Sequence, residues 1–258
     1  MKSSKLHLLY ISIFFAVTAC HRNLVPSTSG SMNKEVIDQN GHPNLLGRAT
    51  RDKLKTPPYG EWFNKNYDSY AVDSVLADQL RPKLAGYRML IFMGTWCGDS
   101  RREVPRFLKL MDCCGVDPSA IEIVTVSNTD SLYKQSPAHE ERGYDIFRVP
   151  SIIILDKRRE MGRIVESPVA SLEKDLLAVL SGAPYAPHYQ GGAFLASLLR
   201  KEKTATLQEQ LPELIEKLRP LVSSPGELNS YARTLAASGQ PQKAQFVKDL
   251  NARLYPGQ

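Results

Sequence analysis

A cysteine stands where an apolar run gives way to a segment with helical spacing. Residues 90–93 are all apolar and predict a buried central strand, and Gly94 gives the backbone freedom to turn. A helix is expected to begin at Cys97. Unpaired N–H groups and a partial positive charge at a helix start stabilise a thiolate, the form of sulfur that attacks disulfides. The residue types therefore point to sulfur chemistry at Cys97.

The residues next to Cys97 act on a thiolate in opposite directions. Ser100 has a hydroxyl that can donate a hydrogen bond to the sulfur. Asp99 competes for the same N–H groups and repels a negative sulfur, whereas Arg101 or Arg102 would favour it if either side chain folds back. Each charge effect at a helix end is worth roughly 0.3–1 kcal/mol, so these contributions nearly offset. We therefore expect a thiolate that is only moderately favoured.

A longer pattern around Cys97 resembles a known family. The pattern is Trp96-Cys97-x-x-Ser100-Arg101-x-Glu103-x-Pro105. It is similar to the Trp-Cys-x-x-Cys-Arg-x-Glu-x-Pro signature of the thioredoxin superfamily, in particular of its extracytoplasmic, TlpA-like and cytochrome-maturation-like branch. Further along, Val149-Pro150 precedes the apolar residues 151–155, where the family places a cis-proline that faces the cysteine. The resemblance covers about residues 56–182.

The resemblance implies a thioredoxin-like α/β fold and a role for each matching residue. Cys97 would be the nucleophile, with Ser100 as its hydrogen-bonding neighbour. Trp96 would shield the site from water, although a tryptophan there can also simply fill the core. Pro150, if cis, would hold the backbone of Val149 ready to pair with an extended substrate chain, whereas a trans-proline at a strand start is the ordinary alternative.

Two departures from the family pattern limit the chemistry. Ser100 replaces the second cysteine, which resolves the mixed disulfide in two-cysteine enzymes. Ile91 stands six residues before Cys97, where many thioredoxins carry a buried aspartate. What remains is monothiol exchange: Cys97 attacks a protein or glutathione-type disulfide, and an external thiol reductant releases it. The rival hypothesis is a redox-inactive module that uses the cleft or the C-terminal helices to bind a protein partner.

The adjacent cysteines Cys113 and Cys114 do not replace the missing resolving thiol. In a continuous helix they would lie about 24 Å from Cys97, which is beyond disulfide reach. Two hypotheses stay open for them. One is a helix end with one thiol packed in the core, and the other is a disulfide between the adjacent cysteines or between chains.

The first residues are typical of an exported lipoprotein. Lys2 and Lys5 precede an apolar run at 8–19, which has the length of a signal peptide and is short for a membrane span. The run ends in Val-Thr-Ala-Cys20, which resembles the lipobox of bacterial lipoproteins. We expect removal of residues 1–19, lipidation of Cys20 and a place in the cell envelope on a periplasm-facing membrane; a plain secretory signal with a chance cysteine is the alternative. Residues 20–55 are expected to form a flexible, lipid-anchored tether.

The elements expected to position Cys97 alternate between strands and helices. Strands are predicted at 87–93, 121–126, 152–155 and 160–165, and helices at 72–84, 97–113 and 169–180. This order predicts a central mixed sheet that is flanked by helices and covered on both faces. Residues 128–149 form a long polar connection, in which a short helix is expected near 137–141.

Residues 183–258 are expected to form an all-helical C-terminal extension. A linker at 183–192 leads to helical spacing at 193–200 and at 206–218, where Pro212 should kink or restart the helix. Two further helices, 227–238 and 242–254, are predicted to form an αα-hairpin. A single hairpin cannot bury its own apolar face, and we favour a cap that packs on the α/β domain over a surface for a partner.

Composition and spacing argue against several other functions. The formal net charge of +6 becomes +4 once the two lysines of residues 1–19 are removed, and basic residues do not cluster with aromatic ones. Nucleic-acid binding is therefore not expected. The five histidines lack the Cys/His spacing of a zinc site, and no Gly-rich phosphate loop is present. We therefore expect no metal and no cofactor.

Overall fold

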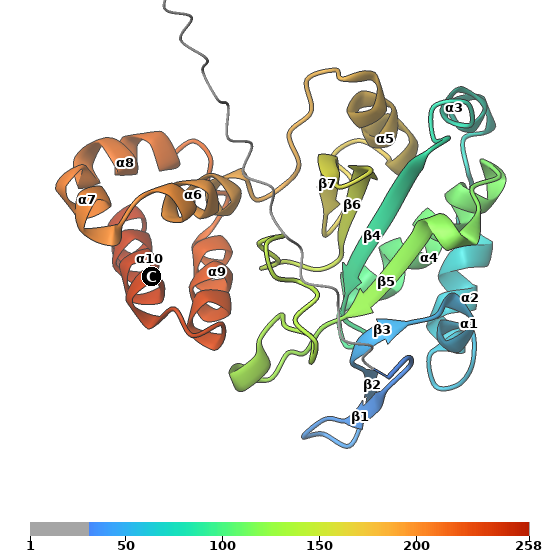
Figure 1. Ribbon diagram of the computed structural model, residues 1–258, viewed down its shortest axis with the longest axis horizontal. Coiled ribbons are helices and arrows are strands. Elements are labelled where there is room, and N and C mark those ends of the chain that lie inside the picture. The colour runs from blue at the N-terminus through green and yellow to red at the C-terminus, as the bar shows by residue number, and fades with distance from the viewer. Residues whose placement is uncertain (1–30, 258) are drawn as a thin grey trace, which may run out of the picture.

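The computed structural model describes residues 31–257, which form an α/β part followed by a group of helices (Figure 1). The expected signal peptide at 1–19 and the lipidation site Cys20 lie outside the described residues. Within residues 31–257, no helix is long and apolar enough to cross a membrane. The α/β class predicted from the sequence is confirmed.

A mixed five-stranded sheet lies at the centre of the α/β part. The strand order is β3-β5-β4-β6-β7. The strands are β3 (Gly47–Ala49), β4 (Tyr87–Met93), β5 (Ile121–Thr125), β6 (Ser151–Asp156) and β7 (Arg159–Val165). β4 pairs parallel with β5 and antiparallel with β6, and the edge strands β3 and β7 pair antiparallel with their neighbours. Cys97 therefore follows the central strand of the sheet.

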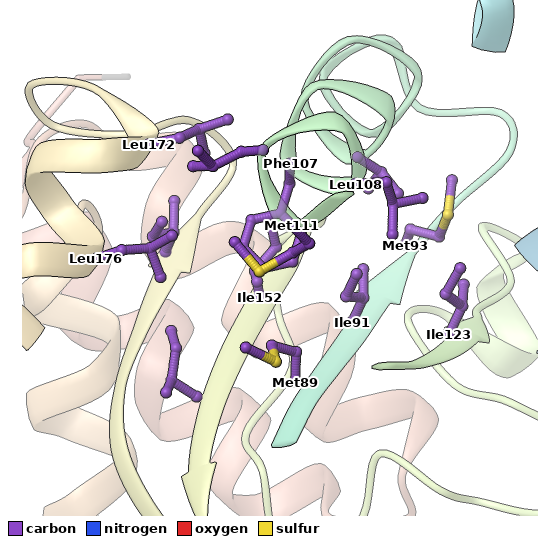
Figure 2. Close-up of a cluster of buried hydrophobic side chains, with 14 of the residues drawn as sticks. Met89, Ile91, Met93, Phe107, Leu108, Met111, Ile123, Ile152, Leu172 and Leu176 are labelled. Atoms are coloured by element: carbon purple, nitrogen blue, oxygen red, sulfur yellow. The ribbon is translucent and has the colours of Figure 1, made fainter. Parts of the chain in front are cut away.

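Helices cover one face of this sheet. They are α1 (Arg51–Leu54), α2 (Gly60–Ser69), α3 (Ser74–Leu80), α4 (Gly98–Cys113) and α5 (Leu172–Ser181). Met89, Ile91 and Met93 of β4 meet Phe107 and Met111 of α4 in a buried core on this face (Figure 2). Because side chains alternate along a strand, every second residue of β4 belongs to this core.

The other face of the sheet is covered by an irregular connection at 126–149. Leu90 and Phe92 of β4 point to this face and pack with Ile146 and Val149 of the connection. Phe92 and Val149 are 0% and 1% exposed. Both faces are thus covered, as predicted, but helices α1–α5 all pack on the first face. The connection supplies enough apolar side chains to exclude water from the second.

Residues 35–55 are folded, which corrects the predicted tether at 20–55. This segment contains β1 (Glu35–Ile37) and β2 (Pro43–Leu45), which pair with each other, and then β3 and α1. Leu45 and Leu54 are 1% and 0% exposed, and the backbone N–H of Leu45 donates to Thr95 Oγ1 (3.1 Å). Strands of three residues are too short to show a periodic pattern, so the sequence did not reveal them.

The long connection also differs from prediction. Residues 137–141, expected to hold a short helix, form turns. The Ser136 hydroxyl lies 2.6 Å from carboxylate oxygens of both Glu140 and Glu141, and these contacts hold the turn closed. A 3-10 helix, η2 (Asp130–Leu132), lies earlier in the connection. Local side-chain bonds of this kind compete with helix formation.

The C-terminal extension is all-helical, as predicted. Its helices are α6 (Gln190–Lys201), α7 (Thr204–Glu209), α8 (Leu211–Leu218), α9 (Pro225–Ala237) and α10 (Pro241–Leu254). α9 and α10 form the predicted hairpin, and the helix restarts just before Pro212. The extension has its own apolar core, to which the connection contributes Phe147. Figure 1 shows this connection between the sheet and the extension. The extension therefore packs on the α/β part within one chain.

Candidate active site

Cys97 occupies the N-cap position of α4, directly after the turn that ends β4. Its side chain is half-buried. The backbone N–H of Cys97 donates to the carbonyl oxygen of Gly94 (2.9 Å), which closes the turn. A helix start supplies unpaired N–H groups and a partial positive charge to a group at this position. The structure thus gives Cys97 the position that the sequence predicted.

The residue before Pro150 contacts Cys97, as the resemblance implied. The Val149–Pro150 peptide bond is cis. Cys97 Sγ donates a hydrogen bond to the carbonyl oxygen of Val149 (3.2 Å). Pro150 directly precedes β6, which pairs with β4, so adjacent strands bring the two residues together. Segments 52 residues apart in sequence therefore meet at the sulfur.

Trp96 forms one wall of the site. Its indole N–H donates to the carbonyl oxygen of Val126 (2.9 Å). Its ring also lies against Gly94, where an added Cβ would stand 2.5 Å from Trp96 Cε2. The half-buried ring packs beside Cys97 on the second face of the sheet. Glycine is required at position 94 because the ring approaches the backbone so closely.

Ser100 supports the turn rather than the sulfur. It is fully buried, and its Oγ accepts a hydrogen bond from the backbone N–H of Gly94 (3.2 Å). Ser100 does not form the expected hydrogen bond with Cys97. The sulfur bonds to the carbonyl oxygen of Val149 instead. A buried N–H that loses its acceptor costs about 1–3 kcal/mol. Ser100 therefore stabilises the turn that presents Cys97.

The charged residues at the start of α4 pair with one another. Arg102 donates to Asp99 (2.7 Å) and to Glu103 (2.6 Å). Arg101 donates through Nε to the carbonyl oxygen of Thr95 (2.5 Å). Neither arginine folds back onto the sulfur. Arg102 instead pairs with Asp99, which reduces the repulsion expected between that carboxylate and a thiolate.

Lys134 also belongs to the site, which the sequence did not predict. Its side chain is 6% exposed, and Nζ lies 4.2 Å from the ring centroid of Trp96 and 5.1 Å from that of Tyr133. Burial lowers the pKa of Lys134 to about 8, and a negative charge at Cys97 acts in the opposite direction. The ammonium group is thus close enough to a thiolate at Cys97 for the two charges to attract.

No feature of the sequence marks Lys134. It lies in the irregular connection, with a left-handed backbone (φ 59°), and its backbone N–H donates to the carbonyl oxygen of Ser127 (2.9 Å). The direction of its side chain depends on this local bond and on packing against Trp96. Periodicity cannot predict the direction of a side chain in a segment that has none.

The C-terminal extension borders the site through α9. The hydroxyl groups of Tyr133 and Ser230 lie 3.1 Å apart. Arg233 pairs with Asp130 (2.8 Å), and its guanidinium lies 3.9 Å from the ring centroid of Tyr133. Since Tyr133 also contacts Lys134, α9 supports the part of the connection that holds the buried amine.

The adjacent cysteines lie at the far end of α4. Cys113 is exposed, Cys114 is buried, and both are free thiols. Burial raises the pKa of the Cys114 thiol to about 11. The structure therefore agrees with the first hypothesis for this pair, a helix end with one thiol in the core.

Places that could hold a bound group lie elsewhere. A cavity of about 550 Å³ lies along β3 and β5, where Arg51, Arg88, Leu108 and Ile123 are among its lining residues. Cys97 does not line it. Within residues 31–257, no three His, Cys, Asp or Glu side chains gather as metal ligands would.

Comparisons with known proteins add little to this geometry. No family model and no curated protein matches the sequence. The solved structures that are similar include a protein of unknown function from Pseudomonas aeruginosa, which has 18% identity and a TM-score of 0.37 over 50% of this chain and 87% of that one. An HIV epitope scaffold has 17% identity and a TM-score of 0.26 over 49% of this chain and 99% of its own. Likeness at these TM-scores carries no argument about fold or function.

Proposed function

We propose that residues 56–182 are a thioredoxin-like domain and that Cys97 performs monothiol thiol–disulfide exchange. The order of elements supports the first part: β4, α4 and β5 are followed by the hairpin β6-β7 and by α5, as expected for such a domain. One observation carries the second part. The sulfur of Cys97 is held at the N-cap of α4, 3.2 Å from the carbonyl oxygen of the residue that precedes Pro150.

The reaction proceeds in two balanced steps. The Cys97 thiolate attacks one sulfur of a disulfide, a new S–S bond joins Cys97 to that sulfur, and the other sulfur leaves as a thiolate with the electron pair of the broken bond. Ser100 has no sulfur with which to resolve this mixed disulfide. An external thiolate therefore attacks the adduct, takes the bound group away as a new disulfide and restores the Cys97 thiolate.

Lys134 and Trp96 support the thiolate in this proposal. The Lys134 ammonium group is buried beside the site, and charges attract more strongly where water is excluded. The ring of Trp96 separates part of the site from solvent and lies over the Lys134 side chain, which holds the cation in place. Lys134 is thus a positioning and charge-balancing residue, while Cys97 forms the bond.

The N-terminal residues support a cellular location for the proposed exchange reaction. We propose that Cys20 carries a lipid anchor and that the protein works at a periplasm-facing membrane of the cell envelope. Metabolic labelling with a fatty-acid analogue tests this directly. The wild-type chain should incorporate the label and the Cys20→Ser variant should not; a chain that incorporates none, or a variant labelled as strongly as wild type, would contradict the anchor.

Reaction of the full chain with glutathione disulfide tests the exchange proposal. Trypsin separates the thiols, because Cys97 lies in the fragment 89–101 and Cys113 and Cys114 lie in 110–134. Cys20 lies in 6–22 of the unprocessed chain and in 20–22 once residues 1–19 are removed. We expect a glutathione adduct on fragment 89–101 that an added thiol reductant removes. Cys97→Ser should abolish this adduct, and Cys113→Ser should leave it unchanged. An unmodified fragment 89–101 would contradict the proposal.

The second candidate function is a redox-inactive binding module. The observation that favours it is the burial of Ser100, which is committed to the turn and leaves Cys97 without an internal resolving group. The same experiment separates the two functions. A folded chain whose Cys97 forms no adduct would support the binding module and exclude exchange.

A further inference from the structure

The backbone just before Pro150 is already occupied by contacts within the chain. The carbonyl oxygen of Phe147 accepts a hydrogen bond from Ser230 Oγ of α9 (2.6 Å). The carbonyl oxygen of Val149 accepts from Cys97 Sγ (3.2 Å) while Cys97 is a thiol, and only the bond to Phe147 persists in the thiolate form. The side chains of Phe147 and Val149 are 5% and 1% exposed, so little of this segment faces solvent.

Arg148, between these two residues, is held by the extension and by the end of β7. Its guanidinium donates to the carbonyl oxygen of Gly226 (2.6 Å) and to Glu166 (3.1 Å). It also lies 4.5 Å from the ring centroid of Tyr189, whose hydroxyl donates to Glu166. Residues 147–149 are therefore fixed from the side of α6 and α9.

An extended polypeptide needs free backbone groups in order to bind beside a reactive residue. Recognition by strand addition depends on main-chain N–H and C=O groups that the partner can reach. Here α9 takes the carbonyl of Phe147, and Phe147 itself fills the core of the extension. The extension thus stands where a polypeptide substrate would have to lie along residues 147–149.

A small disulfide does not need this segment. It must reach the sulfur of Cys97, which is half-buried and next to the exposed Gly98. We propose, on the basis of the exchange function proposed above, that Cys97 takes low-molecular-weight disulfides of the glutathione type and that the C-terminal extension excludes extended polypeptide disulfides. The bond changes are those of the first exchange step, with the small thiolate as the leaving group.

The test compares two disulfides on the full wild-type chain. One is glutathione disulfide, and the other is the disulfide-linked dimer of a flexible peptide of about nine residues with a central cysteine, long enough to lie along a strand. Each rate of adduct formation on fragment 89–101 is divided by the rate of N-acetylcysteine with the same disulfide, which removes differences in intrinsic reactivity. We expect the corrected rate with glutathione disulfide to be higher by about tenfold or more, because the protein offers the peptide no free backbone along residues 147–149.

A double variant, Ser230→Ala with Arg233→Ala, loosens α9 from the connection. We expect it to raise the ratio of the corrected peptide rate to the corrected glutathione rate by about tenfold, because the carbonyl of Phe147 is freed. Any change at Lys134 that passes through Tyr133 acts on both rates and cancels in this ratio. Asn229→Ala is the matched control, since Asn229 is exposed on the same helix and pairs with Asn251 of α10. The control should leave both rates unchanged.

The outcomes separate this inference from the function on which it rests. Adduct formation with neither disulfide would remove the exchange function itself. Equal corrected rates with the two disulfides in the wild type would keep exchange but overturn the role of the extension. A double variant that still prefers glutathione disulfide as strongly as wild type would also overturn that role. If the double variant does not fold, the wild-type comparison decides alone.

Discussion

Lys134 shows how one buried charge can link the stability of the protein to the exchange reaction proposed for Cys97. The ammonium group is almost fully buried and lies over the ring of Trp96. Burial opposes the charged form, so the pKa of Lys134 falls from 10.5 to about 8. Near neutral pH the buried Lys134 cation therefore lowers the stability of the folded protein. The same cation lies where it would attract and stabilise a thiolate at Cys97.

Replacement of this residue should separate the two effects. Lys134→Met removes the cost of the buried charge, so we expect it to stabilise the protein by about 2 kcal/mol near neutral pH, after allowance for the lost contact with Trp96. The same variant should slow alkylation of Cys97, because the nearby cation is gone. Chemical denaturation and iodoacetamide kinetics measure the two quantities. Lys174→Met, at an exposed position of α5, should change neither.

The stability difference between this variant and the wild type should depend on pH. Below about pH 8 the lysine is protonated in both the folded and the unfolded chain, and the folded state bears the full cost. Between about 8 and 10.5 the folded chain gives up this proton while the unfolded chain keeps it, so wild-type stability rises relative to the variant. The advantage of Lys134→Met should therefore shrink across this window. A constant advantage would contradict a buried, titrating lysine.

At the scale of elements, the turn between β4 and α4 depends on a glycine and an indole ring in contact. Gly94 accepts the Cys97 N–H through its carbonyl oxygen and donates its own N–H to Ser100. Trp96 packs on the same glycine and bonds to Val126. Each contact orients the first turn of α4, and so the position of Cys97.

A methyl group at position 94 should disturb this turn. In Gly94→Ala the new Cβ would stand 2.5 Å from the Trp96 ring, and the ring would have to move away from Val126. We expect a loss of about 1–3 kcal/mol in unfolding free energy and slower alkylation of Cys97. Gly98→Ala is the control, because a Cβ there meets nothing within 4 Å. Equal stability of the two variants would contradict the role given to Gly94.

The elements also show what could be predicted from the sequence. β4 was predicted to the residue, because a run of apolar residues before a glycine has few other interpretations. The helix with Cys97 at its start, and the hairpin of α9 and α10, followed from proline, glycine and apolar spacing. β1 to β3 were missed because each has three residues and takes its hydrogen bonds from distant or equally short partners.

The candidate site was predictable only in part, for a related reason. Cys97, Trp96 and Pro150 lie at ends of regular elements, and the structure brings them together. The contacts of Ser100 with the turn and of Lys134 with Trp96 depend on side-chain packing in irregular segments. Patterns of local sequence do not specify such packing.

At the scale of the whole molecule, two cores share one connection. Val149 belongs to the core on the second face of the sheet, and Phe147 belongs to the core of the extension. The bonds that join these parts cross long stretches of sequence: Ser230 lies 83 residues from Phe147 and 97 from Tyr133. Packing of the extension on the α/β part could be favoured from the sequence, because a single hairpin cannot bury its own apolar face. Its location beside Cys97 could not be predicted.

Truncation of Phe147 should weaken this docking. Phe147→Ala removes a ring that is 5% exposed in the core of the extension, and we expect a loss of about 3 kcal/mol or more in unfolding free energy. The extension should then separate more often, which exposes Tyr185 and Tyr189 of the linker to limited chymotrypsin digestion. Ile37→Ala, at a residue that is 66% exposed, should leave both stability and cleavage unchanged. Linker cleavage at the wild-type rate in Phe147→Ala would contradict the shared core.

The central claim is that the fold selects Cys97 as the reactive sulfur, and the chain contains its own reference in Cys113, which is more exposed. The most direct measurement treats the folded full chain with limiting glutathione disulfide near neutral pH and compares the initial rates of modification of fragments 89–101 and 110–134. We predict that the half-buried Cys97 reacts faster than the exposed Cys113 by about tenfold or more, because the helix start and Lys134 favour its thiolate. Reaction of Cys113 at an equal or higher rate would contradict the account.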